Sequence, residues 1–310
     1  MMGKGAQARI DGIVAREAPV AVIFRRGPSR HTQLLTWNLE TDEITPGQWI
    51  VGRVYTRRCD LSPDGKLLIG AFKKHPYFSG AWTAISRPPY FSAIAVWCGT
   101  GAWNGGGLWR SKREVEVNVW ADAENIVSPP PWLSHRPLNL PMSEDEPIFG
   151  MRLQTYGWTC LQAHVAELVN PGWKENWEKL SQFSQNPIPY DRYAEVKALI
   201  EESSPRYRTT QPGLWCKPLP SGRLERVQDD QEEWSISELS GLAQKTFRPG
   251  VFETQFLDID YRGRVVFGDQ GCLWAWEGFP DGKPTLIADL TQNKFESIAP
   301  PDWAVSLHPS

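Results

Sequence analysis

The stretch that decides the fold reads DLSPDGKLLIG and occupies residues 60–70. Its first residues end one strand, the Ser-Pro-Asp-Gly turn reverses the chain, and an apolar run begins the next strand. A second copy, DIDYRGRVVFG, occupies residues 258–268. The acidic residue and both glycines match, which aligns Asp60 with Asp258, Gly65 with Gly263 and Gly70 with Gly268. The sequence therefore predicts one hairpin that occurs twice, with glycine at the turn position that needs a positive φ.

A Trp that follows Leu or Thr recurs where a predicted strand meets a polar turn. The four positions are Trp37, Trp109, Trp215 and Trp274. We expect these residues to occupy equivalent strand positions and to be mostly buried. Their spacing is uneven, which favours four-stranded units separated by insertions of different size over a strict repeat.

The repeated hairpin resembles the inner hairpin of β-propeller repeats of the WD40 and TolB type, in which an SPDG turn is typical. The resemblance implies a propeller fold. It implies no functional residues, because the chain lacks the Trp-Asp dipeptide, the Gly-His opener and the even period of those repeats. The segment AWTAISRPPYF at residues 81–91, with the glycine-rich run after it, also looks like uncharacterised bacterial proteins.

We therefore predict a single mainly β domain over residues 1–310, a propeller-like array of antiparallel four-stranded units. A β-sandwich is the alternative, because short strands and turns occur in both architectures. A helical insertion is predicted at about residues 163–203, where Asn170-Pro171 forms a helix start. At roughly 40–50 residues per blade, the remaining chain makes five or six blades. Val20–Phe24 is an available partner for a C-terminal strand that closes the ring.

Composition limits the classes of function. The chain of 310 residues has 33 Lys and Arg against 36 Asp and Glu, a net charge of −3, so general nucleic-acid binding is not expected. Residues 88–109 carry no charge, but two prolines and several glycines exclude a membrane-spanning helix. Five cysteines without a CxxC pair predict free thiols in a reducing cytoplasm.

Motifs of known chemistry are missing from the sequence. It has no phosphate-binding P-loop, no HExxH metal motif and no GxSxG nucleophile elbow. The glycine-rich run at residues 99–107 is interpreted as a wide hairpin loop, and Cys160 with His164 would face each other only on a helix. Asp258 and Asp260 are more typical of turn chemistry than of a Ca²⁺ site, since the further carboxylates are absent. We predict no catalytic residue, no metal and no cofactor.

The binding surface is predicted in residues 73–110, interpreted as a long excursion between two strands. The candidate side chains are Tyr77, Trp82, Arg87 and Trp103. Aromatic and basic side chains on a loop of a rigid scaffold are typical of protein interfaces, so we expect these residues to be exposed on one rim.

The sequence favours a non-enzymatic protein-interaction or scaffold module in the bacterial cytoplasm, with another protein as its partner. The alternative is a carbohydrate-binding or glycan-processing protein that uses exposed tryptophans, because 16 tryptophans are present and flat rings stack on sugars. A hydrolase of propeller type is a third reading for which no residue set is visible. The sequence does not indicate the oligomeric state.

Overall fold

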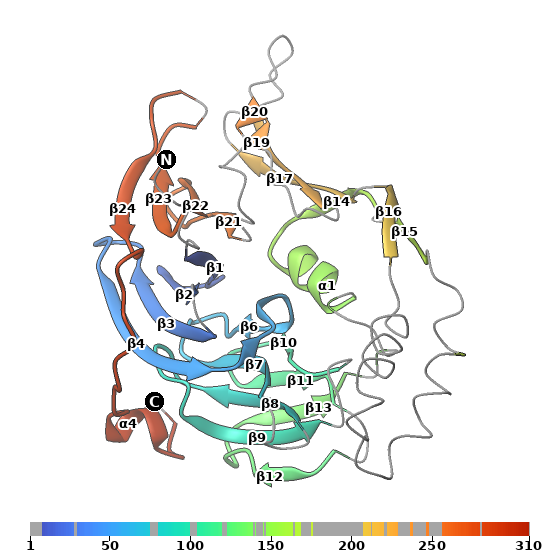
Figure 1. Cartoon of the computed structure of the whole chain (residues 1–310), viewed down its shortest axis with the longest axis vertical. Helices are drawn as coiled ribbons and strands as arrows, with labels where there is room; N and C mark the ends of the chain where they lie inside the picture. The colour runs from blue at the N-terminus through green and yellow to red at the C-terminus, as the bar shows by residue number, and fades with distance from the viewer. Residues whose placement is uncertain are drawn as a thin grey trace, which may run out of the picture.

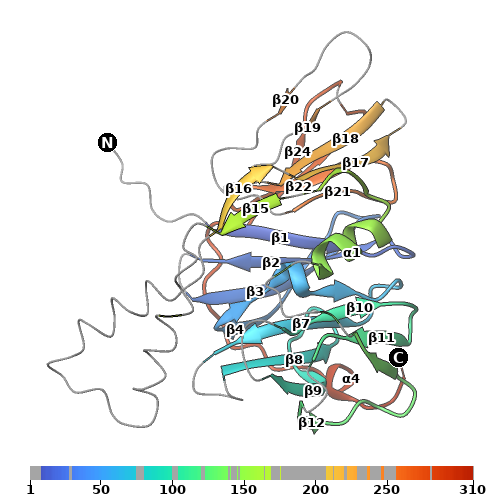
Figure 2. The same ribbon diagram turned by 90° about the vertical axis from the view of Figure 1, so that its right-hand side faces the viewer.

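The structure is a computed structural model in which five small sheets are arranged as the blades of a β-propeller (Figure 1). The residues that it describes are 8–27, 30–74, 80–99, 104–119, 123–138, 140, 145, 147–163, 165–168, 175, 207–211, 213–219, 222–228, 236–237, 246–247, 256–279 and 281–309. The prediction of a mainly β propeller is confirmed, with five blades. In the side view, the strands of blades 1 and 2 run from one face of the ring to the other (Figure 2).

The five blades are numbered in chain order. Blade 1 comprises β1 (Arg9–Val14), β2 (Val20–Arg26), β3 (His31–Asn38) and β4 (Ile44–Val51). Blade 2 comprises β5 (Arg53–Val54), β6 (Asp60–Leu61), β7 (Leu68–Lys73), β8 (Ala81–Ser86), β9 (Ala93–Gly99) and β12 (Asn125–Val127). Blade 3 comprises β10 (Gly107–Trp109), β11 (Glu114–Val117) and β13 (Ser134–Pro137). Blade 4 comprises β14 (Thr159–Gln162), β17 (Gly213–Leu219) and β18 (Gly222–Gln228), and blade 5 comprises β21 (Leu257–Ile259), β22 (Val265–Asp269), β23 (Cys272–Trp276) and β24 (Thr285–Asp289).

Smaller elements complete the described chain. Two short strand pairs are β15 (Val165–Leu168) with β16 (Tyr207–Gln211) and β19 (Ile236–Ser237) with β20 (Thr246–Phe247). The helices are the 3-10 helix η1 (Thr56–Arg58), α1 (Ile148–Thr155) near the centre of the ring, and α4 (Asp302–Val305). No helix among the described residues is both long and apolar enough to cross a membrane.

The repeated hairpin forms the inner edge of blades 2 and 5, as predicted. In each copy the glycine N–H donates to the residue three positions earlier, Gly65 to Ser62 at 2.8 Å and Gly263 to Asp260 at 2.9 Å. The two glycines have φ values of 74° and 77°. Since L side chains rarely adopt this conformation, glycine is what lets each strand reverse within so few residues.

The segment 73–110 is not an excursion, so that prediction is wrong. It contains β8 and β9, the strands that follow β7 in blade 2 just as β23 and β24 follow β22 in blade 5. The hairpin between β22 and β23 is tight, which made the longer β7–β8 connection look like an insertion. The glycine-rich run is no hairpin either, because it connects blade 2 to blade 3 and its ends, β9 and β10, do not pair.

The ring closes through side chains rather than through an exchanged strand. Val20–Phe24 pairs with β1 and β3 inside its own blade, so the predicted pairing with a C-terminal strand is wrong. Instead, Arg264 of blade 5 donates two hydrogen bonds of 2.8 Å to the carboxylate of Asp42 in blade 1. Charge-assisted bidentate bonds of this kind are directional and strong. They join the first and last blades at one face of the ring.

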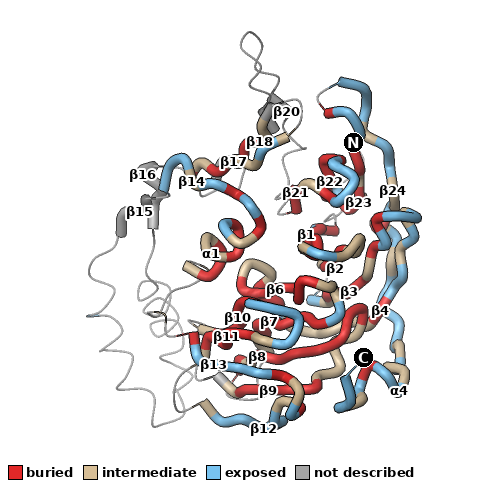
Figure 3. Tube along the Cα trace, turned by 180° about the vertical axis from the view of Figure 1, so that it is seen from behind, coloured by how far each residue is buried: buried red, intermediate tan, exposed pale blue. Residues whose placement is uncertain are grey.

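The core runs through the inner strands, which are buried, whereas β12 and β24 carry many exposed residues (Figure 3). Most of the described tryptophans belong to the core or pack against it, as predicted. Trp37 and Trp109 are fully buried, and Trp215 is 7% exposed. Trp274 is only half-buried and packs against a different core cluster from Trp37, so the expected equivalence of the four positions is wrong.

The predicted helical insertion at about residues 163–203 lies largely outside the described residues. Of its described residues, 165–168 form β15, whereas Glu175, which follows the predicted helix start, is helical. His164 is outside the described residues, and Cys160 lies on the strand β14, so the helical pairing of these two residues is not seen.

Candidate functional site

A pocket of about 580 Å³ opens where turns of blades 1 and 5 approach blade 4 and the end of α1. Four segments line it: residues 14–19 between β1 and β2, residues 155–157 after α1, residues 217–218 of β17, and residues 258–261 at the β21–β22 turn. We call it the mouth pocket. A smaller cavity of about 30 Å³ shares Tyr156 and Asp258 with the pocket. Chain reversals from two blades therefore meet the middle strand of a third blade and the end of a helix.

An ion pair between blades 4 and 5 forms one wall of the mouth pocket. Lys217 Nζ lies 2.6 Å from Asp258 Oδ1, and the two side chains are 18% and 12% exposed. The Lys217 ammonium also lies 5.9 Å from the centre of the Trp158 ring, close enough for a cation–π contact. Because the pair is largely shielded from water, its hydrogen bond fixes the position of β17, the middle strand of blade 4, relative to β21, the inner strand of blade 5.

Arg16 and Glu17 supply charge on the side of blade 1. Arg16 Nη2 donates to the Trp109 carbonyl at 3.0 Å, and its guanidinium lies 5.5 Å from the centre of the Tyr156 ring. The exposed Glu17 lies 3.3 Å from Lys112, an ion pair that water screens strongly. The pocket thus presents both signs of charge.

Below the pocket lies a buried polar cluster centred on Asp60. Its Oδ1 accepts from the Leu61 N–H at 2.9 Å and lies 2.8 Å from the Tyr156 hydroxyl, and its Oδ2 accepts from the Trp109 N–H at 2.7 Å. Burial raises the pKa of Asp60, although these hydrogen bonds and Arg152 oppose the shift. Burial, together with the charge of Asp60, raises the pKa of Tyr156 well above its ordinary value. Every oxygen of the carboxylate has a partner, so the cluster supports the floor of the pocket.

An aspartate on the inner strand makes the same local hydrogen bond in three blades. Asp11, Asp60 and Asp258 each accept through Oδ1 from the N–H of the next residue, at 2.8, 2.9 and 2.8 Å. The repeated hairpin identified Asp60 and Asp258, but sequence reasoning missed Asp11, Arg16 and Lys217. The turn after Asp11 is longer and has no Pro-Asp-Gly signature. The sequence therefore marks this position only by an aspartate that precedes the apolar run VAVIF at residues 20–24.

The neighbouring Asp260 is a turn residue rather than a ligand. Its Oδ1 accepts from the N–H groups of Arg262 and Arg264, and its Oδ2 accepts from Arg264 Nε at 2.7 Å. Asp258 meanwhile pairs with Lys217. Within the described part of the chain, no group of three or more His, Cys, Asp or Glu side chains could hold a metal ion. Both carboxylates serve the blade, in line with the interpretation of this motif as turn chemistry.

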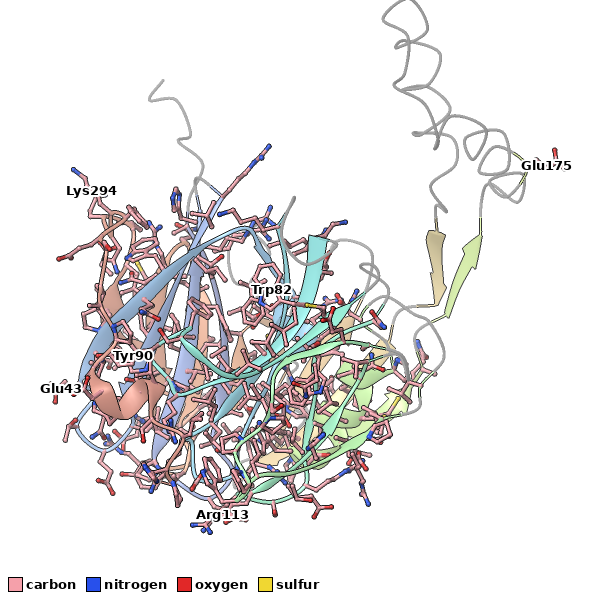
Figure 4. The ribbon with its side chains drawn as sticks, turned by 90° about the horizontal axis from the view of Figure 1, so that it is seen from below. Glu43, Trp82, Tyr90, Arg113, Glu175 and Lys294 are labelled. Atoms are coloured by element: carbon pink, nitrogen blue, oxygen red, sulfur yellow. The ribbon has the colours of Figure 1, made fainter. Side chains whose placement is uncertain are left out.

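The predicted binding residues do not meet at one surface. Tyr77 and Trp103 lie outside the described residues. Trp82 on β8 is half-buried and stacks on Phe72 at 5.6 Å (Figure 4). It lies beside Lys73, at the opposite end of β7 from the Ser62–Lys66 turn, and hence at the other end of the blade from the mouth pocket.

Arg87 is buried, 1% exposed, so its predicted exposure is wrong. Its guanidinium reaches the backbone of the C-terminal segment and donates to the Ser306 carbonyl and, at 2.7 Å, to the His308 carbonyl. Residues more than 200 positions away cover this side chain, which is information that local composition does not carry.

Comparison with known protein families finds no family model that matches this chain, and comparison with curated proteins finds no matching sequence.

Proposed function

We propose that this propeller is a non-enzymatic protein-interaction module and that its partner docks at the mouth pocket. The observation that carries the proposal is the pocket itself, which is formed by segments of three blades and the end of α1. Concave sites between structural units are where proteins most often bind other molecules. Blades that pack around a shared core hold such a site rigid, which lowers the entropy cost of binding.

The chemistry of the pocket supports binding more than turnover. The Lys217 ammonium and the Asp258 carboxylate are hydrogen-bonded to each other, so each neutralises the other. Asp60 and Tyr156 are buried below the pocket in mutual contact. What remains at the surface is suited to recognition: the exposed Tyr261, the exposed Glu17 and the half-buried Arg16.

Tyr261 is the best candidate for an anchor residue. It lines the pocket at the tip of the β21–β22 turn and is 53% exposed. Tyrosine is enriched among interface residues whose truncation weakens binding strongly, because its ring buries a large area at little cost in entropy. A partner segment of mixed charge fits the surrounding groups, which carry both signs.

The setting that we propose is the bacterial cytoplasm, and the unpaired state of the five cysteines supports a reducing compartment. The glycan-binding alternative has weaker support. Among the tryptophans that the structure describes, Trp303 is the one with an exposed ring, and it packs edge-on against Tyr90 instead of facing the pocket. We therefore do not assign sugar recognition to this protein.

The test is affinity purification with the tagged full-length chain and with two single variants. Tyr261→Ala should weaken recovery of a stoichiometric partner at least about tenfold, since truncating an anchor costs 2 kcal/mol or more. Leu286→Ala is the matched control, because Leu286 is 48% exposed on β24 and does not line the pocket. Equal recovery of the partner by both variants would remove the mouth pocket from the binding surface.

A further inference from the structure

The chain after β24 does not join a sheet but runs along the outside of the ring. Residues 291–309, which we call the strap, leave blade 5, pass the outer strand β4 of blade 1 and end in α4 beside blade 2 (Figures 1 and 3). Most of the strap is exposed, and Ala304 is its buried residue. Little apolar surface therefore holds the strap in place.

What holds the strap is a row of side-chain donors aimed at backbone carbonyls. Arg25 donates to the carbonyls of Leu290 and Thr291 at 3.0 and 3.1 Å, and Gln48 donates to that of Ile298 at 3.0 Å. Further along, Arg87 donates to the carbonyls of Ser306 and His308, and Trp132 Nε1 donates to that of Leu307 at 2.6 Å. These donors bind main-chain carbonyls of the strap on both sides of α4 rather than particular side chains.

Two shallow aromatic contacts add to the row. Phe295 lies 4.8 Å from the His31 ring and 6.1 Å from the Trp49 ring, and Trp303 lies 5.4 Å from the Tyr90 ring, centre to centre. Both strap residues are still half exposed, at 56% and 50%. The strap also contains Pro300-Pro301, which keeps this part of the chain extended.

The buried side-chain donors of this surface need hydrogen-bond acceptors. Arg25 and Arg87 are 2% and 1% exposed, and burial lowers the pKa of both guanidinium groups. Burying a cation without hydrogen-bond acceptors is costly. The surface is thus built to receive carbonyl oxygens. Besides these bonds, the strap is held by the two aromatic contacts, by Ala304, and by a hydrogen bond of 2.8 Å from Asn293 Nδ2 to Gln33 Oε1. An equivalent strap offers the same acceptors, so exchange between two copies conserves every contact.

We propose that the surface formed by Arg25, Gln48, Arg87 and Trp132 is a binding site for an extended, proline-containing segment, and that the strap of a second copy of this chain is its occupant in trans. The site lies on the outer side of blades 1 and 2, away from the mouth pocket. If the strap proposal fails, the proposed function of the mouth pocket is unaffected. If the mouth-pocket proposal fails, the strap proposal is likewise unaffected.

The probe is a fluorescent peptide with the sequence of residues 290–309, and the readout is fluorescence anisotropy. In the unchanged chain the strap competes in cis at a high effective concentration, so the peptide should bind weakly. Ala304→Arg displaces the buried residue of the strap and should tighten peptide binding at least tenfold. Trp303→Ala removes an exposed contact and should act in the same direction if Ala304→Arg does not fold.

The receiving surface is tested with Trp132→Phe, combined with Trp303→Ala. This change keeps a ring near Arg87 but removes the N–H that binds the Leu307 carbonyl, and it should weaken peptide binding several-fold. Trp82→Phe is the control, since Trp82 is half-buried and packs on Phe72 rather than on the strap. Absence of peptide binding by both folded strap variants would overturn the site.

The choice of occupant is tested by mixing tagged and untagged full-length chains at high concentration. Exchange of straps should let the untagged chain co-purify with the tagged one, and an excess of the peptide should reduce this recovery. Peptide binding without any co-purification would overturn the assignment of a second copy as the occupant.

Discussion

Trp109 binds Asp60 twice: its backbone N–H donates to Oδ2 at 2.7 Å, and its indole N–H donates to the Asp60 carbonyl oxygen at 3.2 Å. Asp60 lies on the inner strand of blade 2 and Trp109 on that of blade 3, so this one residue pair joins two blades. Both residues are buried, and no water competes for these bonds. The junction between blades is therefore polar and specific at its centre.

Replacing Asp60 with Asn should destabilise the protein by about 1–3 kcal/mol, because one acceptor oxygen becomes an NH2 group and either the Leu61 N–H or the Trp109 N–H loses its acceptor. The measurement is urea-induced unfolding followed by tryptophan fluorescence. Glu40→Gln, at an exposed position, serves as the control and should leave the midpoint within experimental error. An Asp60→Asn variant as stable as the parent would show that the carboxylate is dispensable.

The Asp42–Arg264 contact predicts an acid-sensitive contribution to stability. Hydrogen bonding to Arg264 lowers the pKa of Asp42 below its ordinary value, despite opposing burial. The pKa of an Asp carboxyl in the unfolded chain is about 3.9. When the folded-state pKa is lower, the carboxylate stabilises the fold at pH values above about 3.9, and this stabilisation is lost as the pH falls through the folded-state pKa.

Asp42→Asn tests this contribution, because Asn keeps the shape of the side chain and tolerates the φ of 60° at this position. We expect the variant to lose about 1–3 kcal/mol at neutral pH. The difference in unfolding free energy from the parent should shrink once the pH falls below about 4. A difference that stays constant from neutral pH into strong acid would argue against the ion pair as its origin.

Trp37 and Trp274 should differ in their effect on stability. Trp37 is fully buried, so Trp37→Ala should cost about 3–5 kcal/mol. Trp274 is half-buried and stacks on Phe267 at 6.5 Å, so Trp274→Ala should cost clearly less. Thermal denaturation of the two variants gives the order, and equal losses would contradict the burial seen here.

Two glycines separate backbone strain from steric overlap. Gly106 and Gly263 have nearly the same φ, 78° and 77°. A Cβ at Gly106 would lie 1.9 Å from the Arg58 carbonyl oxygen, whereas a Cβ at Gly263 would have no neighbour within 4 Å. Gly263→Ala should cost about 1–2 kcal/mol from φ alone. Gly106→Ala should cost substantially more, and chemical denaturation of both variants measures the difference.

The sequence predicted the parts of the fold that local chemistry determines. Gly65 and Gly263 identified the repeated hairpin, because the turn requires glycine and the apolar run follows it directly. The same comparison misplaced residues 73–110, since the β7–β8 connection is longer than its counterpart in blade 5. Local patterns do not show which strand pairs with which, so the third and fourth strands of blade 2 looked like a loop.

The candidate site was harder to predict, because its residues come from distant parts of the chain. Arg16 and Lys217 are ordinary surface cations by sequence, and only the ring brings them to one pocket. Arg87 shows the opposite error, because the sequence predicted it as an exposed binding residue and it is buried. A cation among aromatic residues resembles an interface, but here its partners are carbonyl groups of the strap, which no local pattern reveals.

The contact between Asp42 and Arg264 joins residues that are 222 positions apart. Blade 1 is the first blade to leave the ribosome, and one apolar face of it, including Ile10, Ile23 and Leu35, packs against blade 5. At a synthesis rate of 5–20 residues per second, roughly 10–45 s pass between the synthesis of that face and the synthesis of blade 5, which covers it. During this interval the nascent chain exposes a hydrophobic sheet to its surroundings. Production of this protein should therefore depend on chaperones that protect blade 1 until blade 5 arrives.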